Sequence, residues 1–258
     1  MKLEEIKVLF VDDEVDFLEQ AKRIVKEKDD RFVIETSNSV EKALEIIENE
    51  NIDAVVSDYR MPEKDGIEFL RVLREEKENR IPFILFTGRG WEEVAMKALN
   101  LGANKYIWKK EELNLYTKKE EELVEQYDIL AKEIVNEVKE YEKEKTMELM
   151  RHTIEMAKDG IFWISPEGGI LYGNQTVRDM LGYSQKELQS LSISEIDPHF
   201  KEEKRKEIWE KLKEKGAMTF ETEQKDKEGM VFPVKITSNY VRHKDRELEF
   251  AFVRRTDD

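Results

Sequence analysis

The sequence contains no cysteine. This absence excludes disulfide bonds, zinc or iron–sulfur sites built on thiolates, thiol nucleophiles and chromophores attached through cysteine. Proline and glycine are also scarce, with 5 and 11 residues among 258. Because 39% of the residues are hydrophobic, the chain can build cores, and collagen-like or wholly disordered architectures are excluded.

Long hydrophobic runs are absent too. No stretch approaches the roughly 18 apolar residues that a membrane-spanning helix requires, and the amino-terminal segment MKLEEIKVLFVDDE carries acids before its first apolar run. We therefore expect a cytoplasmic protein without a membrane partner. Positive charge is in the minority, with 44 Lys and Arg against 59 Asp and Glu and a formal net charge of −15. That balance disfavours nucleic acid as a partner.

The first half of the chain alternates short apolar runs with segments of helical periodicity. Strands are predicted at 7–11, 32–36, 54–57, 83–86 and 106–108, each followed by a helix. Runs such as DAVVSD and IPFILFTG are apolar at consecutive positions, which is typical of strands buried on both faces of a parallel sheet. The pattern predicts an α/β fold with a doubly wound, five-stranded parallel sheet.

Polar side chains follow four of these strands. Asp12 and Asp13 come after the first strand, Asp58 after the third, Thr87 at the end of the fourth and Lys109 after the fifth. In such a sheet, ligands bind outside the carboxyl ends of the strands. Three carboxylates in one crevice repel each other unless a cation neutralises them, and their oxygens select a hard ion, for which we expect Mg²⁺.

A hydroxyl and an ammonium facing this cluster can each bond an oxygen of an incoming phosphoryl group, and a metal-neutralised carboxylate can attack phosphorus. The strand ends therefore predict phosphorylation of an aspartate. Each residue also has an ordinary interpretation: Asp12 and Asp13 as helix caps, Thr87 with Gly88 as a turn, and Lys109 as a solvated charge. Their conjunction on the expected strands favours the phosphorylation site.

Residues 1–120 resemble the receiver domain of two-component response regulators, through VLFVDDE, VVSDYRMPEKDG, FTG and LGANKYIWKK. The resemblance implies a flavodoxin-like fold in which Asp58 is the phosphoacceptor. It also implies that Lys109 binds the phosphoryl group and that Thr87 and Tyr106 are the switch residues. It further implies a cognate histidine kinase as the phosphodonor.

The same resemblance implies that Mg²⁺ is bound by Asp12, Asp13, Asp58 and the backbone carbonyl of Arg60. Arg60 and Arg89 stand two residues beyond the acceptor and beyond the threonine, at positions that in receivers modulate how water reaches the acyl phosphate. Alternatively, both arginines are solvated charges. One departure is Lys110, because the family usually has proline directly after its lysine.

The chain then runs from Leu113 nearly to Arg151 without glycine or proline, and its Glu and Lys content predicts one long helix. Apolar residues recur every three or four positions at Leu123, Tyr127, Leu130, Ile134, Val138 and Tyr141. This spacing is compatible with an imperfect coiled coil, so residues 121–146 are predicted to be a helical linker that dimerises and passes a signal between domains. The alternative is that the segment from Leu123 to Ile134 is the last helix of the receiver.

Residues 147–258 have shorter elements with frequent turn signals. Strands at 161–164 and 170–172, several helices, and a meander at 219–224, 231–240 and 247–254 predict an α+β domain with a five-stranded antiparallel sheet. The segments DGIFWISPEGGILYGN, LGYSQKEL and KDKEGMVFPVKITSNY make this part similar to the PAS sensor domain. That resemblance implies sensing or protein pairing, including a homodimer, and leaves the PAS ligand unknown.

Two groups of residues bear on a PAS ligand. His152 and His199 are isolated histidines, which are more often structural than haem ligands. Aromatic residues at strand spacing either line a pocket or belong to the core, and the core is the commoner case; these are Trp163, Phe220, Phe232, Phe250 and Phe252.

The predicted function is that of a response regulator. Asp58 accepts a phosphoryl group from a histidine kinase, and the linker helix relays the change to the PAS domain and a downstream signalling protein. We find no glycine-rich nucleotide loop, so no enzyme activity is expected beyond autophosphorylation from small phosphodonors and autodephosphorylation. One alternative is the amino-terminal sensory part of a hybrid histidine kinase whose catalytic domains lie outside this chain. Another is a binding module in which PAS occupancy controls dephosphorylation of the receiver.

Overall fold

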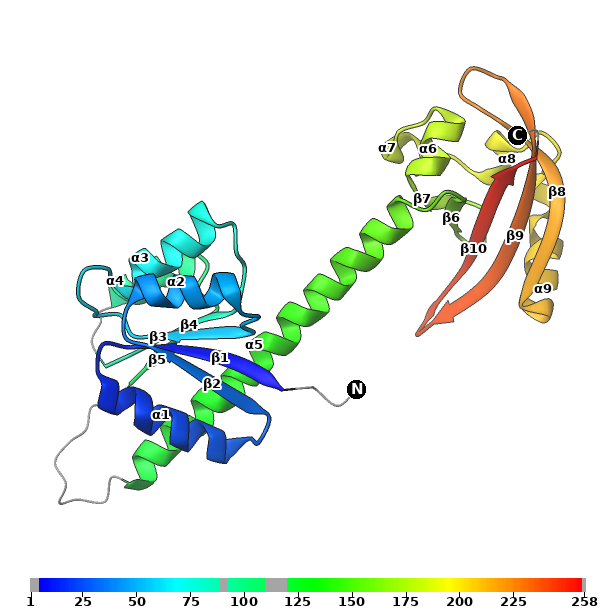
Figure 1. Cartoon of the computed structure of the whole chain (residues 1–258). Helices are drawn as coiled ribbons and strands as arrows, with labels where there is room; N and C mark the ends of the chain where they lie inside the picture. Colours follow the sequence, from blue (N-terminus) through cyan, green and yellow to red (C-terminus); the bar gives the residue numbers. More distant parts are fainter. Residues whose placement is uncertain (1–4, 89–91, 110–119, 257–258) are drawn as a thin grey trace. The chain divides into compact units, whose positions relative to one another are not determined.

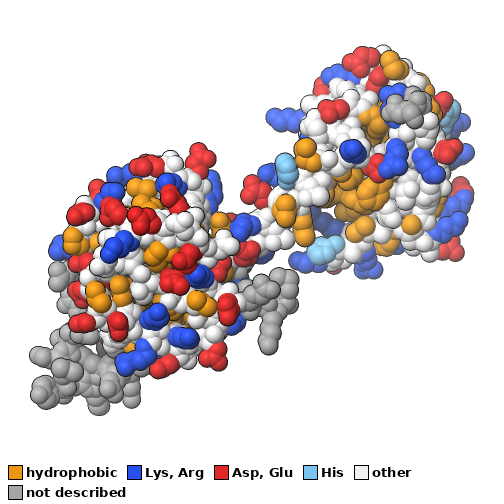
Figure 2. All heavy atoms as spheres, in the orientation of Figure 1, with side chains coloured by type: hydrophobic (Ala, Val, Ile, Leu, Met, Phe, Trp, Pro, Cys, Tyr) orange, Lys and Arg blue, Asp and Glu red, His pale blue; other side chains and the backbone are white. Residues whose placement is uncertain are grey.

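The computed structural model describes residues 5–88, 92–109 and 120–256, and it leaves the side chains of residues 120–124 and Glu202 undescribed. The chain divides into two compact units, Met1–Lys145 and Thr146–Asp258. Among the described helices, none combines the length and the apolar character needed to cross a bilayer. Figure 2 shows acidic and basic side chains interspersed over the visible face of each unit.

The first unit alternates strands and helices (Figure 1). Its strands are β1 (Ile6–Val11), β2 (Phe32–Ser37), β3 (Ala54–Ser57), β4 (Phe83–Thr87) and β5 (Lys105–Trp108). Its helices are α1 (Val15–Lys28), α2 (Val40–Asn49), α3 (Gly66–Arg71, continued by a π-helical turn at Val72–Glu76) and α4 (Glu92–Asn100), and α5 (Glu120–Glu155) begins in this unit and ends in the second. The described strands pair in parallel in the order β2-β1-β3-β4-β5. The predicted doubly wound parallel sheet is thereby confirmed.

Both faces of this sheet are buried, because successive side chains of a strand point to opposite faces. On β1, Val8 and Phe10 join one hydrophobic cluster with α1 and α5, whereas Leu9 and Val11 join a second cluster with α2, α3 and α4. The consecutive apolar residues of the strands are explained by this double burial. The sheet therefore exposes its carboxyl-terminal edge, where the helices begin, as the place for polar chemistry.

Helix α5 packs its first turns onto the first unit. Tyr127, Leu130, Ile134 and Val138 are buried in the cluster that contains Phe10. Part of the heptad-like spacing therefore reflects packing against the sheet, as the alternative interpretation has it, whereas residues 142–153 are exposed. The domain boundaries at 120 and 146, the coiled coil and the dimer remain predictions, and the side chain of Leu123 lies outside the described residues.

The second unit contains an antiparallel sheet with helices on one face (Figure 1). Its strands are β6 (Gly160–Ile164), β7 (Ile170–Gly173), β8 (Ala217–Lys225), β9 (Val231–His243) and β10 (Arg246–Arg255), in the order β7-β6-β10-β9-β8. Its helices are α6 (Gln175–Leu181), α7 (Gln185–Leu188), α8 (Ile193–Ile196), a 3₁₀ turn at Glu202–Lys204 and α9 (Arg205–Lys215). The predicted five-stranded antiparallel α+β domain is confirmed.

The aromatic residues of the second unit do not gather in one place. Phe232 is buried in the core and Phe220 packs against it. Trp163 and Phe252 are exposed on the sheet, and the ring of Phe250 contacts that of Phe252 with the ring centroids 4.9 Å apart. These aromatic residues thus divide between the core and the open face of the sheet instead of lining a common pocket.

His199 is exposed, and its Nε2 contacts Glu223 at 2.6 Å.

Candidate functional site

A cavity of about 820 Å³ opens at the carboxyl-terminal edge of the parallel sheet. Six of the predicted site residues line it: Asp12, Asp13, Asp58, Arg60, Thr87 and Lys109. Tyr106 is not among its lining residues. Arg89 and Lys110 lie outside the described residues.

The register of the strands brings these side chains together. Val11 lies opposite Ser57, so the residues that follow them, Asp12 and Asp58, leave neighbouring strands at the same level. The amide of Asp58 donates to the carbonyl of Val11 at 2.8 Å, and the amide of Lys109 donates to the carbonyl of Thr87 at 2.9 Å. Backbone hydrogen bonds therefore continue past the strand ends and hold the chain in place where the site begins.

Asp12 is nearly inaccessible to solvent, with 2% of its surface exposed. Its Oδ2 accepts a hydrogen bond from Lys109 Nζ at 3.0 Å, and its Oδ1 accepts one from the amide of Glu14 at 2.9 Å. Burial raises the pKa of Asp12 to about 6, although the ammonium of Lys109 opposes that shift. Helix α1 begins at Val15 with Glu14 as its N-cap residue, so Asp12 is not the helix cap of the ordinary interpretation.

Asp58 is half-buried at the end of β3. Its Oδ2 accepts a hydrogen bond from the amide of Arg60 at 2.7 Å. Burial raises the pKa of Asp58, while the charge of Lys109 and hydrogen bonds from the Arg60 amide and the Thr87 side chain lower it. Asp12 and Asp58 thus share the Lys109 ammonium, and burial outweighs the stabilisation that it gives to either carboxylate.

The loop after Asp58 explains the Asp65–Gly66 pair in the sequence. Asp65 caps α3 by accepting from the amides of Ile67 and Glu68, and Glu68 bonds back to the amide of Asp65. A Cβ atom on Gly66 would lie 2.3 Å from the carbonyl oxygen of Asp58. Glycine is therefore required for α3 to begin directly against the backbone of Asp58.

Tyr106 lies on β5, next to the site. Its hydroxyl is buried and has no hydrogen-bond partner among the described residues. Burial raises the pKa of Tyr106, and the negative charge of Asp58 raises it further. A buried hydroxyl without a hydrogen-bond partner destabilises the folded state. A rotation of the Tyr106 ring that brings the hydroxyl to water or to a partner would remove this cost.

The sequence analysis did not assign several of the lining residues to the site, among them Phe17, Gln126 and Tyr127. The Nζ atom of Lys109 lies 3.2 Å from the centroid of the Phe17 ring. An aromatic residue in the first turn after the acidic pair was the available signal for Phe17. Gln126 and Tyr127 belong to α5, and their approach to the site depends on packing that no local motif reveals.

The oxygen atoms at this site suit a hard divalent cation. Among the described residues, no group of three acidic or histidine side chains forms a complete metal site. Mg²⁺ rarely needs one, because it usually keeps several waters and binds through one or two carboxylates plus phosphate oxygens. The carboxylates of Asp12 and Asp58, with Asp13 on the same cavity wall, are donors of that kind.

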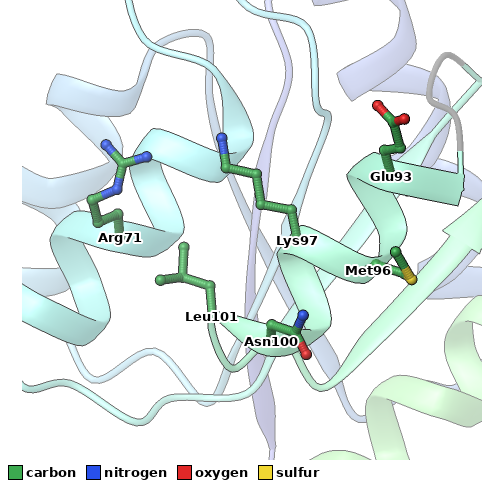
Figure 3. Close-up of a pocket in the computed structure, with 6 residues that line it drawn as sticks. All are labelled: Arg71, Glu93, Met96, Lys97, Asn100 and Leu101. Carbon is green, nitrogen blue, oxygen red and sulfur yellow. The ribbon is translucent and has the colours of Figure 1, made fainter.

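A second pocket, of about 450 Å³, lies between α3 and α4 (Figure 3). It is lined by Arg71, Glu93, Met96, Lys97, Asn100 and Leu101. None of these six residues is buried, and the close-up shows their side chains spread along the two helices without converging on a common point. We therefore place the candidate chemistry in the first cavity.

Comparisons with known proteins agree with the two-unit architecture. A family model described as a response regulator receiver domain matches residues 8–119, and a PAS domain model matches residues 158–254. A chemotaxis protein CheY homolog of Campylobacter jejuni is 32% identical over 109 residues, which cover 40% of this chain and 81% of that protein.

Two further similarities are more limited in coverage or in structural agreement. A protein-glutamate methylesterase/protein-glutamine glutaminase of Nitrobacter winogradskyi is 37% identical over 111 residues, 43% of this chain, but the match spans only 26% of that protein. The crystal structure of the PAS domain of an HTR-like protein from Haloarcula marismortui is 22% identical with a TM-score of 0.43, covering 45% of this chain and 97% of that one.

Proposed function

The chain belongs to the response regulators of two-component systems, with a PAS domain after its receiver, and from this premise we propose that Asp58 accepts a phosphoryl group from a histidine kinase. Receivers are signalling proteins rather than classical enzymes. The observation that carries the proposal is the position of the Asp58 carboxylate on a cavity shared with Asp12, Thr87 and Lys109.

The reaction is an in-line displacement at phosphorus. A carboxylate oxygen of Asp58 forms the new bond to phosphorus, while the bond from phosphorus to the phosphohistidine nitrogen breaks and its electron pair stays with the imidazole. With a small donor such as acetyl phosphate, the bond to the acetate oxygen breaks instead. Burial raises the pKa of Asp58. The negative charge of this carboxylate is therefore only partly stabilised by its neighbours before the phosphoryl group and Mg²⁺ bind.

The other residues of the cavity bind and orient the phosphoryl group. Mg²⁺, when bound, supplies positive charge that neutralises the carboxylates and the phosphoryl oxygens. Asp12, Asp13, Asp58 and the backbone carbonyl of Arg60 are the residues proposed to hold it. The Thr87 hydroxyl and the Lys109 ammonium each donate to a phosphoryl oxygen, and in this proposal the ammonium shifts from the Asp12 oxygen, which it contacts at 3.0 Å, toward the phosphoryl group.

Signal output follows from the same change. Thr87 moves toward the phosphoryl group, and Tyr106, whose hydroxyl is buried without a partner among the described residues, reorients with it. Helix α5, which packs on the receiver and continues to Glu155, passes the change to the PAS domain and to a downstream signalling protein. A homodimer through α5 or the PAS domain is part of this proposal.

Arg60 bears on how long the signal lasts. It is exposed and lines the cavity beside Asp58. We expect Arg60→Ala to alter the rate at which the acyl phosphate hydrolyses, because the side chain stands where water approaches. An unchanged decay rate would assign Arg60 to the solvated surface.

The direct experiment is an intact-mass measurement after incubation with acetyl phosphate and Mg²⁺. The wild type is expected to gain the mass of one phosphoryl group, and Asp58→Ala is expected to gain none. Asp128→Asn is the matched control, because Asp128 is an exposed carboxylate paired with Lys28 at 2.7 Å on the surface of the same unit. A gain that persists in Asp58→Ala, or that does not need Mg²⁺, would overturn the proposal.

A further inference from the structure

Three aromatic rings connect the site to helix α5. The ring of Phe17 lies beside Lys109, with 3.2 Å between Nζ and the ring centroid. The centroids of Phe17 and Phe86 are 6.2 Å apart, and those of Phe86 and Tyr127 are 6.0 Å apart with the rings inclined at 62°. We call Phe17, Phe86 and Tyr127 the aromatic column.

The column begins at the lysine that is proposed to bind the phosphoryl group. Lys109 has 18% of its side chain exposed, with the Asp12 carboxylate and the face of Phe17 as neighbours. An ammonium over a ring face is attracted by the electrons of the ring, and more strongly where water is excluded. Phe17 therefore restricts the positions that Lys109 can take.

The column ends on α5. Phe86 and Tyr127 are both 1% exposed and lie in the cluster that also holds Leu130 and Ile134. Close-packed interiors transmit displacements, because a ring cannot move without its neighbours giving way. The two ring contacts therefore offer a route by which a shift of the Lys109 ammonium can reach α5.

This route differs from the one through Tyr106. Tyr106 packs against the cluster formed with α2, α3 and α4, whereas the aromatic column lies in the cluster formed with α1 and α5. The two clusters are on opposite faces of the sheet. The switch residues implied by the family resemblance thus act on one face, and the helix that continues toward the PAS domain packs on the other.

We propose that Phe17 is a positioning residue for Lys109 and that the aromatic column couples the position of this lysine to helix α5. The proposal rests on the phosphorylation of Asp58 proposed above. When Lys109 exchanges the Asp12 oxygen for a phosphoryl oxygen, its ammonium moves relative to the Phe17 ring, and Phe86 and Tyr127 repack against α5.

The first test compares phosphorylation rates with acetyl phosphate at saturating Mg²⁺. Phe17→Leu is expected to slow the reaction about tenfold, which is within the range of a partly desolvated cation–π contact, and Phe17→Tyr is expected to restore it. Phe69→Leu is the matched control, because Phe69 forms a comparable ring pair with Phe83, 5.5 Å between centroids, in the other cluster. Equal rates in wild type and Phe17→Leu would overturn the positioning role.

The second test follows the wild type by NMR and amide hydrogen exchange before any variant is made. Because Lys109 Nζ lies 3.2 Å from the centroid of the Phe17 ring, the ring is expected to shift the NMR resonances of the Lys109 side chain. Addition of beryllofluoride with Mg²⁺, a mimic of the phosphoryl group, is expected to change that shift. In the same samples, amide hydrogen exchange around Tyr127 is expected to change, and Phe17→Leu is expected to remove that response. Binding of the mimic without any response around Tyr127 would overturn the coupling, whereas failure of the wild type to bind the mimic or to be phosphorylated would reject the proposed function itself.

Discussion

The two units treat buried charge in opposite ways. In the PAS unit, Arg205 and Glu249 are both buried, and the guanidinium donates to Glu249 at 2.7 Å and to the carbonyls of Ser165 and Pro166 at 2.7 and 2.9 Å. The hydroxyl of Ser238 donates to the other oxygen of Glu249 at 2.5 Å. This ion pair, which joins α9 to the sheet, has its partners supplied entirely by the protein.

In the receiver unit, the buried carboxylates at the strand ends are not satisfied in this way. Asp12 and Asp58 share one ammonium, and burial raises the pKa of both. Both carboxylates line a cavity, whereas the Arg205 network does not line either of the pockets described above. Buried charges that are fully paired within the protein hold structural elements together, as Arg205 and Glu249 do. Buried carboxylates that the protein neutralises only in part indicate a site for a ligand.

The largest effect is expected from Asp58→Asn. Phosphorylation is expected to be lost entirely, because the amide is not a nucleophile toward phosphorus. The free energy of unfolding of the receiver is expected to stay the same or rise, since burial raises the pKa of Asp58 and therefore disfavours its ionised form at neutral pH. Amide hydrogen exchange of β1 measures that free energy, and clear destabilisation would contradict the comparison.

Glu249→Ala is expected to destabilise its unit, in contrast to Asp58→Asn. It leaves the buried guanidinium of Arg205 without its carboxylate, and breaking a buried pair in this way costs about 3–5 kcal/mol. Hydrogen exchange of β9 in the PAS unit measures the loss. The control is Glu247→Ala. Glu247 pairs with Lys213, which is 39% exposed, and accepts a hydrogen bond from the Tyr240 hydroxyl at 2.7 Å, so that a smaller loss than in Glu249→Ala is expected. Equal losses of stability in Glu249→Ala and Glu247→Ala would show that the buried ion pair stabilises the PAS unit no more than the exposed one does.

A smaller effect is expected from Tyr106→Phe. Removing a buried hydroxyl that lacks a partner among the described residues is expected to stabilise the receiver by roughly 1 kcal/mol. Phosphorylation by acetyl phosphate is expected to continue, because the hydroxyl does not line the cavity. Denaturant unfolding followed by hydrogen exchange of β5 tests this, and a destabilised variant would show that the hydroxyl is satisfied in solution.

The smallest effect concerns the PAS unit at high pH. Burial, together with the hydrogen bond to Glu155 at 2.7 Å, raises the pKa of Tyr172 to about 12. The phenol is thus favoured in the folded state, so its stabilising contribution is complete below the ordinary tyrosine pKa near 10 and is lost as the pH rises toward 12. Glu155→Gln is expected to lower the pKa of Tyr172 toward its ordinary value, and an NMR titration of the Tyr172 ring measures it. An unchanged pKa would show that Glu155 does not act on this phenol.

Much of the receiver could be predicted because its signals are local. Asp12, Asp58 and Thr87 follow apolar runs that are recognisable as buried strands, and the parallel topology then brings strand ends together. Gly66 could be recognised as part of a motif, but its reason, the carbonyl of Asp58 2.3 Å from a would-be Cβ, appears only in the structure.

The remainder depends on contacts between distant parts of the chain. Arg205 and Glu249 are 44 residues apart, and nothing in the local pattern of either segment pairs them. The heptad-like spacing of α5 has two explanations, packing on a partner helix or packing on a sheet, and burial of Tyr127 in the receiver core identifies the second for that part of the helix. The position of Phe17 in the first turn after the acidic pair was a local signal, but its contact with Lys109 joins residues far apart in the sequence and appears only in the structure.

Reductive trapping shows most directly whether Asp58 carries the phosphoryl group. Borohydride reduces an aspartyl phosphate to homoserine, so peptide sequencing after treatment of the phosphorylated chain identifies the acceptor. We predict homoserine at position 58 and at no other aspartate. Homoserine at position 12 or 13, or at several aspartates alike, would contradict it.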